Sequence, residues 1–366
     1  MQFPTRVLHI FGFVTLVTFA AGAEDDARPF IQELNNIKTI GTTVPANGDV
    51  NPYGIAIVPA TAGALKKGDI LVSNFNNSAN LQGTGVTIDQ IGANGDVTLF
   101  ASLSTHSLPG PCVGGLGLTT ALVALRSGFV IVGSLPTTDG TPATAQAGCL
   151  IILDRNGAAV ATLSGSGING PWDMTAVDLE GFAVLFVSNV LNGTVAGNGN
   201  VVHEGTILRI LLATPSSGAP RELARTVIAS GFGERTDAAA LVIGPTGLAV
   251  SREGRLYVAD TLQNRIAAIS GALYRRDDAG TGVTISQGGA LNGPLGLAIA
   301  PNGDILTVNA ADGNLVEIAP GGKQVAVKPI DISNQGAGTL FGLAIAPDGH
   351  GIYFVDDGNN TLNLLH

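Results

Sequence analysis

Short oxygen-bearing side chains recur along the chain, and each one follows a short apolar run. Asn74 follows DILVS, Asp260 follows LYVA and Asp356 follows IYFV. Such oxygens can accept backbone N–H groups of the next turn, or they can hold a polar ligand. The full set is Asn74, Ser134, Asn189, Asp260, Asn309 and Asp356. Because the residue recurs in every segment, an architectural role fits better than chemistry, and ligand binding is the alternative that we keep.

Histidines give little support for an enzyme. His106, His203 and His350 lie in separate segments. A zinc site built on three imidazoles needs three that converge, and we expect only His106 and His203 to share one face. Glu204 adjoins His203, but neighbouring residues on a strand point to opposite faces, which argues against an acid–base pair. The sequence contains no G-x-S-x-G nucleophile motif.

The first 23 residues have the pattern of a secretory signal peptide. Arg6 supplies a short basic region, residues 7–20 form an apolar core, and residues 21–23 (AGA) form a small-residue cleavage site before Glu24. The alternative is a membrane anchor, but this core is shorter than a span of about 20 residues. We therefore predict a single mature domain over residues 24–366 that is secreted or periplasmic.

The two cysteines, Cys112 and Cys149, fit that location. An even count in an oxidising compartment suggests a disulfide, and two free buried thiols are the alternative. A bridge of this loop length would stabilise the fold by roughly 3–4 kcal/mol if it is unstrained.

The composition favours covered sheets and disfavours nucleic acid. Of 366 residues, 51 are glycine and only 13% are charged, with a mean hydropathy of +0.35. This balance suits stacked sheets joined by tight turns. Lys and Arg number 18 against 28 Asp and Glu. Phosphate contacts need Lys and Arg, so we predict no nucleic-acid partner.

The elements that position the polar residues belong to a repeat. Residues 244–270 read GPTGLAVSREGRLYVADTLQNRIAAIS, residues 293–319 read GPLGLAIAPNGDILTVNAADGNLVEIA, and residues 341–365 read FGLAIAPDGHGIYFVDDGNNTLNLL. The spacing from turn glycine to closing acid or amide is the same from Gly247 to Asp260 and from Gly296 to Asn309. Short runs between glycines and prolines predict strands, and one such unit needs copies beside it to bury its faces.

The pattern P-x-G-L-A-(V/I)-x-x-x-G-x-(L/I)-x-V-(D/N), with Asn264-Arg265-Ile266 in the first unit, resembles the NHL repeat. The resemblance implies an all-β, six-bladed β-propeller. The last repeat ends after three strands, and a lone strand is predicted at residues 37–44. We expect that N-terminal strand to complete the last blade and leave no open sheet edge.

The resemblance also places a ring of residues where the central channel opens on one face, called the top. One residue precedes each turn glycine, and Asp173 stands at the glycine position of blade three. The ring is Tyr53, Leu116, Trp172, Thr246, Leu295 and Phe341. Propellers of the SMP-30/gluconolactonase type, to which the chain is distantly similar, hold a divalent metal there with Glu, Asn and Asp. Only Asp173 is present, so we predict no metal and no cofactor; Ca²⁺ is the one ion considered.

Enclosed aromatic residues at the mouth suit an apolar small molecule, a peptide side chain or a plugged channel. The connections at residues 75–84, 135–147 and 190–203 are long, and they either form a rim over the mouth or are flexible. We predict a monomeric binding module for a small molecule, glycan or protein. The alternatives are a lactonase-like hydrolase or lyase and a structural scaffold. The predicted ligand-binding residues are Tyr53, Asn74, Trp172, Asp173, Asn189, Thr246, Asp260, Asn309, Phe341 and Asp356.

Overall fold

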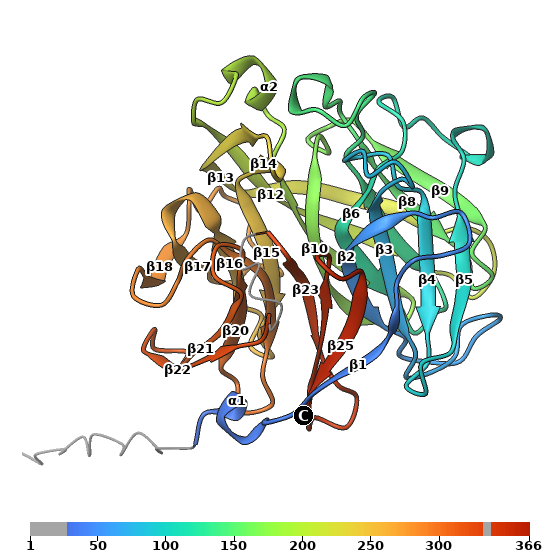
Figure 1. Ribbon diagram of the computed structural model, residues 1–366. Coiled ribbons are helices and arrows are strands. Elements are labelled where there is room, and N and C mark those ends of the chain that lie inside the picture. Colours follow the sequence, from blue (N-terminus) through green and yellow to red (C-terminus); the bar gives the residue numbers. More distant parts are fainter. Residues whose placement is uncertain (1–27, 332–337) are drawn as a thin grey trace, which may run out of the picture.

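The computed structural model describes residues 28–331 and 338–366, and its strands form six sheets arranged in a ring (Figure 1). The chain is thus a six-bladed β-propeller, as predicted. The predicted signal peptide lies outside the described residues. Among those that are described, no helix is long and apolar enough to cross a membrane.

Each blade is an antiparallel sheet whose first strand lies nearest the ring axis. Blade one contains β2 (Val50–Ile57), β3 (Ile70–Asn76), β4 (Thr87–Ile91) and β5 (Val97–Ser102). Blade two contains β6 (Leu118–Ala124), β7 (Val130–Ser134), β8 (Cys149–Leu153) and β9 (Ala159–Ser164). Blade three contains β10 (Pro171–Leu179), β11 (Phe182–Asn189), β12 (Val202–Ala213), β13 (Arg221–Asp237) and β14 (Leu241–Ile243).

The second half of the ring is more regular. Blade four contains β15 (Pro245–Val250), β16 (Leu256–Asp260), β17 (Arg265–Ile269) and β18 (Val283–Gln287). Blade five contains β19 (Pro294–Ile299), β20 (Ile305–Asn309), β21 (Asn314–Ile318) and β22 (Gln324–Pro329). Blade six contains β23 (Leu340–Ile345), β24 (Ile352–Asp356), β25 (Thr361–Leu365) and β1 (Ile37–Thr42).

The two ends of the chain meet in blade six. β1 pairs antiparallel with β25, from Ile37 opposite Leu365 to Thr42 opposite Thr361. A four-residue helix, α1 (Phe30–Glu33), precedes β1 on the bottom face. The backbone N–H groups of Phe30 and Ile31 donate to the buried Glu317 carboxylate at 2.7 and 2.8 Å. The segment that precedes β1 is therefore attached to blade five.

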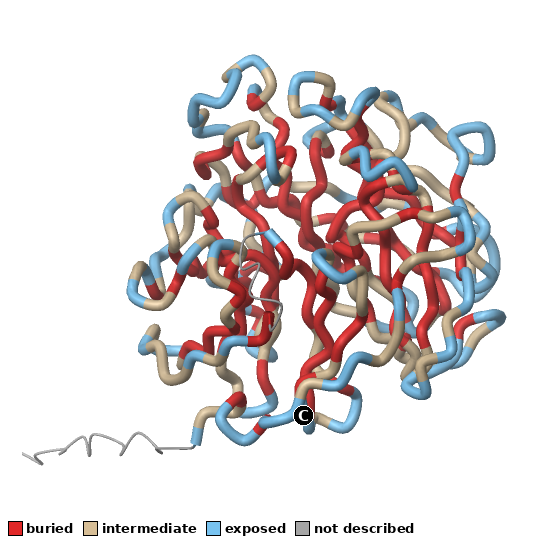
Figure 2. Tube along the Cα trace, in the orientation of Figure 1, coloured by how far each residue is buried: buried red, intermediate tan, exposed pale blue. Residues whose placement is uncertain are grey.

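Packing between neighbouring blades provides the core. The second and third strands are buried along most of their length, as Figure 2 shows. One cluster joins Leu71 and Ile88 of blade one to Val132 and Ile151 of blade two, and equivalent clusters fill the other interfaces. The apolar runs between turns are thus explained by burial on both faces of each sheet.

Blade three departs from the four-strand expectation. Its outer strand β13 continues to Asp237 and forms a hairpin with the additional strand β14, in which Asp237 lies opposite Leu241. This hairpin rises on the top face beside the helix α2 (Thr194–Gly197) (Figure 1). The top face of blade three is therefore built by more backbone than the repeat pattern supplies.

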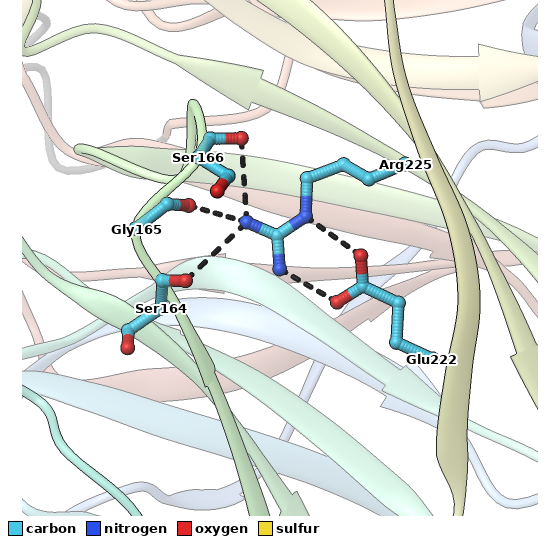
Figure 3. Close-up of polar contacts among 5 residues, drawn as sticks. All are labelled: Ser164, Gly165, Ser166, Glu222 and Arg225. Atoms are coloured by element: carbon cyan, nitrogen blue, oxygen red, sulfur yellow. Dashed lines mark hydrogen bonds and ion pairs between the residues drawn. The ribbon is translucent and has the colours of Figure 1, made fainter.

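Arg225 of β13 donates hydrogen bonds to the segment that connects blades two and three (Figure 3). Its Nε and Nη2 atoms donate to both carboxylate oxygens of Glu222 at 2.9 and 2.6 Å. Nη1 donates to the carbonyl oxygens of Ser164, Gly165 and Ser166, the residues that leave β9. The planar guanidinium thus joins an outer strand to the neighbouring turn.

Candidate functional site

Aromatic rings fill the top of the channel. Tyr53 of blade one and Phe341 of blade six stack with ring centroids 3.7 Å apart, and Phe75 stacks on Tyr53 at 4.6 Å. Trp172 lies 6.3 Å from Phe341. All four side chains are buried. The rings predicted to surround the mouth therefore contact one another across it.

The remaining mouth positions are also buried. Thr246 is hydrogen-bonded to the hydroxyl of Thr261 at 2.7 Å, and Leu295 is 5% exposed. In blade two the position assigned to Leu116 is wrong. Leu118 lies opposite Ser134, as Pro245 lies opposite Asp260 in blade four. Blade two therefore carries Thr119 at the mouth position. The sequence alignment failed there because the inner strand of blade two has no turn glycine to mark its register.

Three of the six polar residues at the ends of the second strands form side-chain hydrogen bonds to nearby backbone N–H groups. Ser134 accepts the N–H of Gly117, Asn189 that of Asn169 and Asn309 that of Asn292. These are bonds of the kind that an architectural role requires.

The other three residues at the ends of the second strands contact side chains or a carbonyl oxygen. Asn74 donates to Thr43 O and to Asp89 Oδ2 at 3.0 and 3.2 Å. Asp260 pairs with Arg265 at 2.8 Å, and Asp356 accepts from the side-chain amide of Asn359 at 2.9 Å. Each of the six predicted residues is buried within its own blade or against the next one. Ligand binding at these positions stays a prediction.

A cavity of about 260 Å³ lies on the axis beneath the aromatic rings, and inner strands of all six blades line it. Most of its lining side chains are apolar and include Ile55, Leu122, Leu248, Leu297 and Leu343, although polar atoms make up more than half of the exposed wall. The inner strands are buried near the top and half-buried at their lower ends, as in the burial of β19 and β23. The cavity therefore opens toward the bottom face, opposite the mouth that the sequence analysis considered.

Asp173 supplies the carboxyl group at the deep end of this cavity. Its Oδ2 accepts the backbone N–H of Leu248 at 2.8 Å, and its own N–H donates to Ser188 Oγ at 3.1 Å. Burial raises the pKa of Asp173 to about 7, although the N–H groups of Leu248 and Met174 oppose the rise. The group can therefore exchange its proton near neutral pH.

Close packing of inner strands explains why this position is a glycine in every blade except two and three. At the equivalent Gly247, a Cβ atom would lie 2.0 Å from Leu295 O, and at Gly296 it would lie 2.2 Å from Phe341 O. A substituent there would collide with backbone. Asp173 fits because it is directed to the Leu248 N–H in the next blade. This makes the axial cavity asymmetric and places an ionisable group at its deep end.

The other polar groups on the cavity wall are Thr120, Thr175 and Asp178. Asp178 lies at the lower end of β10 and accepts the N–H of Arg126 at 2.7 Å. Across residues 28–331 and 338–366, no three His, Cys, Asp or Glu side chains are grouped as a metal would require. With Asp173 at its deep end and leucine and isoleucine side chains on its wall, the cavity can orient a ligand and cover its apolar portion.

The long connections meet on the top face. Thr137 donates through its hydroxyl to Gln82 O at 2.6 Å, and Gln82 donates through its side chain to Ala238 O at 3.2 Å, in the β13–β14 hairpin. Connections of blades one, two and three thus form a linked rim. The predicted disulfide between Cys112 and Cys149 is present and holds the base of the blade-two connection.

Sequence reasoning missed a buried acid beneath this rim. Glu234 of β13 accepts from the hydroxyl of Thr194 and the N–H of Asn192, both at 2.9 Å. Burial raises its pKa to about 8. The run GFGERT around it offered no apolar pattern, so no sequence signal indicated that this glutamate is enclosed.

No protein-family description matches the chain, and no curated protein does. Solved structures do match. A luciferin-regenerating enzyme superposes with a TM-score of 0.57 at 12% identity, covering 90% of this chain and 94% of that one. A gluconolactonase from Xanthomonas campestris gives 0.52 at 12% identity (90% and 88%). Virginiamycin B lyase from Staphylococcus aureus gives 0.50 at 15% identity (90% and 85%).

These similarities show a shared six-bladed fold. The neighbours are of the gluconolactonase-like and virginiamycin B lyase types, which agrees with the distant similarity noted from sequence. The NHL assignment itself has no matching family and stays a prediction. Because each identity is so low, the chemistry of this chain has to be argued from its own residues.

Proposed function

We propose that the protein is an exported binding module that holds a small, mainly apolar amine in its axial cavity. The observation that carries the proposal is Asp173, a buried ionisable carboxyl at the deep end of a cavity of about 260 Å³ that is lined mostly by apolar side chains. A cavity of this size, with one oriented polar group, suits a small ligand. Export is supported by the disulfide, which persists in oxidising compartments.

The carboxyl favours an amine over other polar groups. An ammonium beside Asp173 would stabilise its ionised form, whose charge burial otherwise disfavours. The leucine and isoleucine side chains would cover the apolar part of the ligand and exclude water. An anionic ligand would meet a carboxyl with no basic side chain among the described cavity residues.

Matched probes test this proposal. Benzylamine and benzyl alcohol have nearly the same shape and differ in charge, so binding should be measured for both by calorimetry between pH 5 and pH 8. We expect benzylamine to bind more tightly, with an affinity that rises up to about tenfold per pH unit below pH 7 and then levels, because Asp173 must lose its proton. In Asp173→Asn the pH dependence should vanish. Equal binding of both probes, or an unchanged profile in Asp173→Asn, would refute the proposal.

A hydrolase or lyase of the lactonase-like class is the second candidate. It is supported by a carboxyl whose pKa of about 7 suits general acid–base catalysis and by two structural neighbours that are a gluconolactonase and a lyase. Glucono-δ-lactone hydrolysis, followed by titration of the released acid with and without Ca²⁺, tests it. Turnover above the uncatalysed rate that is lost in Asp173→Asn would favour the enzyme over the binding module.

A further inference from the structure

A second cavity, of about 330 Å³, lies between blades three and four, away from the axis. Every residue that lines it is a glycine or carries a polar side chain, including His203, Gln263, Thr284 and Gln287. His203 comes from the start of β12 and the other three from blade four. An open, concave surface without apolar side chains favours a ligand that is polar around its edge.

The floor of this cavity is a fixed ion pair. Arg265 Nε donates to Asp260 Oδ2 at 2.8 Å, with side-chain exposures of 10% and 1%. Arg265 also donates through Nη1 to Thr284 Oγ1 at 2.9 Å and through Nη2 to Thr281 O at 3.0 Å. The guanidinium is therefore held in one orientation before any ligand arrives, which lowers the entropic cost of binding.

Hydrogen-bonding capacity remains on the guanidinium. Its three contacts use three of the five N–H groups. The Asp260 carboxylate is 1% exposed, so it orients Arg265 and is out of reach of a ligand. The floor thus offers N–H donors, and the side-chain amides of Gln263 and Gln287 at the edge offer acceptors as well as donors.

The charges on this floor disfavour an ionic ligand. An anion that approaches Arg265 is repelled by Asp260, and a cation that approaches Asp260 is repelled by Arg265, since the two groups lie 2.8 Å apart. A hydroxyl group both donates and accepts, so adjacent hydroxyls of a neutral ligand can accept from Arg265 and bond to the glutamine amides without a net charge. Gln263 and Gln287 add further amide groups at the exposed edge, where Gln287 donates to Gln263 O at 3.2 Å.

We propose that this cavity, formed by His203, Asp260, Gln263, Arg265, Thr284 and Gln287, binds a neutral, hydroxyl-rich ring, that of a sugar, either free or at the end of a glycan. The site is independent of the axial cavity, because none of its lining residues is shared with that cavity. It gives the module a second ligand class and places the glycan on the outer part of the top face.

Saturation-transfer NMR with a panel of methyl glycosides of glucose, galactose, mannose and N-acetylglucosamine tests the proposal. We expect at least one to receive saturation from the protein. The variant Gln263→Ala/Gln287→Ala removes only exposed amides, so it should fold normally and weaken that binding about tenfold. Gln146→Ala, an exposed glutamine in the blade-two connection, is the matched control and should bind as the unaltered protein does.

A second variant examines the floor. Asp260→Asn keeps the size of the side chain but removes its charge, and it should abolish sugar binding; circular dichroism and the midpoint of thermal unfolding establish that it folds. Methyl glycosides and the corresponding methyl disaccharides distinguish a free sugar from a glycan end. The proposal is overturned if no glycoside binds, if Gln263→Ala/Gln287→Ala binds as tightly as the unaltered protein, or if inorganic phosphate binds in place of the sugars.

Discussion

Tyr53 and Phe341 stack with their ring centroids 3.7 Å apart, and this contact joins the first blade to the last at the top of the axis. The two residues lie at the same position of their inner strands, one before Gly54 and the other before Gly342. Phe75 extends the stack, and Trp172 approaches it from blade three. The contact lies between the top face and the axial cavity, so the ligand proposed at Asp173 would enter from the bottom face.

Removal of the Phe341 ring should therefore destabilise the whole ring of blades. Phe341→Ala is expected to lower the free energy of unfolding by roughly 3–5 kcal/mol, because the side chain is 4% exposed and its partners cannot close the space. Phe182→Ala is the matched control, since Phe182 is 45% exposed and should cost less than about 1 kcal/mol. Urea unfolding measures both, and equal losses would show that the stack contributes nothing particular.

The sequence predicted the ring of blades because its landmarks are local. A turn glycine, an apolar run and a closing Asp or Asn mark each of blades four to six, and the close approach of Gly247 to Leu295 O explains why the glycine is there. Blade two lacks that landmark, which is why Thr119 was missed. A local residue pattern is therefore enough to predict the strands and turns of a blade.

The side-chain contacts at the candidate site could not be predicted in the same way. Tyr53, Trp172 and Phe341 were correctly brought to the axis, but whether they surround a pocket or contact one another depends on side-chain packing between blades. The β13–β14 hairpin was missed because charged residues interrupt the apolar pattern after Ser230, and pairing with β14 compensates. Glu234 is enclosed by partners that lie 40 or more residues away along the chain.

The disulfide should stabilise the blade-two connection. Cys112 and Cys149 are separated by 37 residues, and the loss of a crosslink over that length is expected to lower the free energy of unfolding by roughly 3–4 kcal/mol. Urea unfolding with and without dithiothreitol measures this for the natural protein and for Cys112→Ala/Cys149→Ala. The reductant should bring the natural protein to the stability of the double variant and leave the variant unchanged. A reductant effect of the same size on both would contradict the assignment.

Arg225 should be irreplaceable by lysine despite its position on an outer strand. A lysine ammonium cannot bind both Glu222 oxygens while it donates to the carbonyls of residues 164–166, so Arg225→Lys is expected to cost about 1–2 kcal/mol. Arg221→Lys, an exposed position on the same strand, should change stability by less than about 0.5 kcal/mol. If urea unfolding gives the same small change for both variants, the carbonyl contacts are dispensable.

Stability should fall as pH rises from about 5 to 9. Burial is the main cause that raises the pKa of Asp89, Asp173 and Asp357 to about 7 and that of Glu234 to about 8. The folded state therefore holds these protons more tightly than the unfolded chain, whose carboxyl groups ionise near their ordinary values. Their contribution is complete below about pH 4 and is lost as pH rises through 7 and 8.

Glu234→Gln isolates one of these groups. The amide keeps an acceptor for Thr194 Oγ1 and the Asn192 N–H but cannot ionise, so the variant should lose less stability between pH 5 and pH 9 than the natural protein, by on the order of 3 kcal/mol. Urea unfolding at each pH measures the difference. Glu180→Gln, at an exposed hairpin, is the control and should follow the natural profile. Parallel profiles for all three proteins would mean that Glu234 is already ionised in the folded state, stabilised by Thr194 and Asn192 more strongly than burial destabilises it.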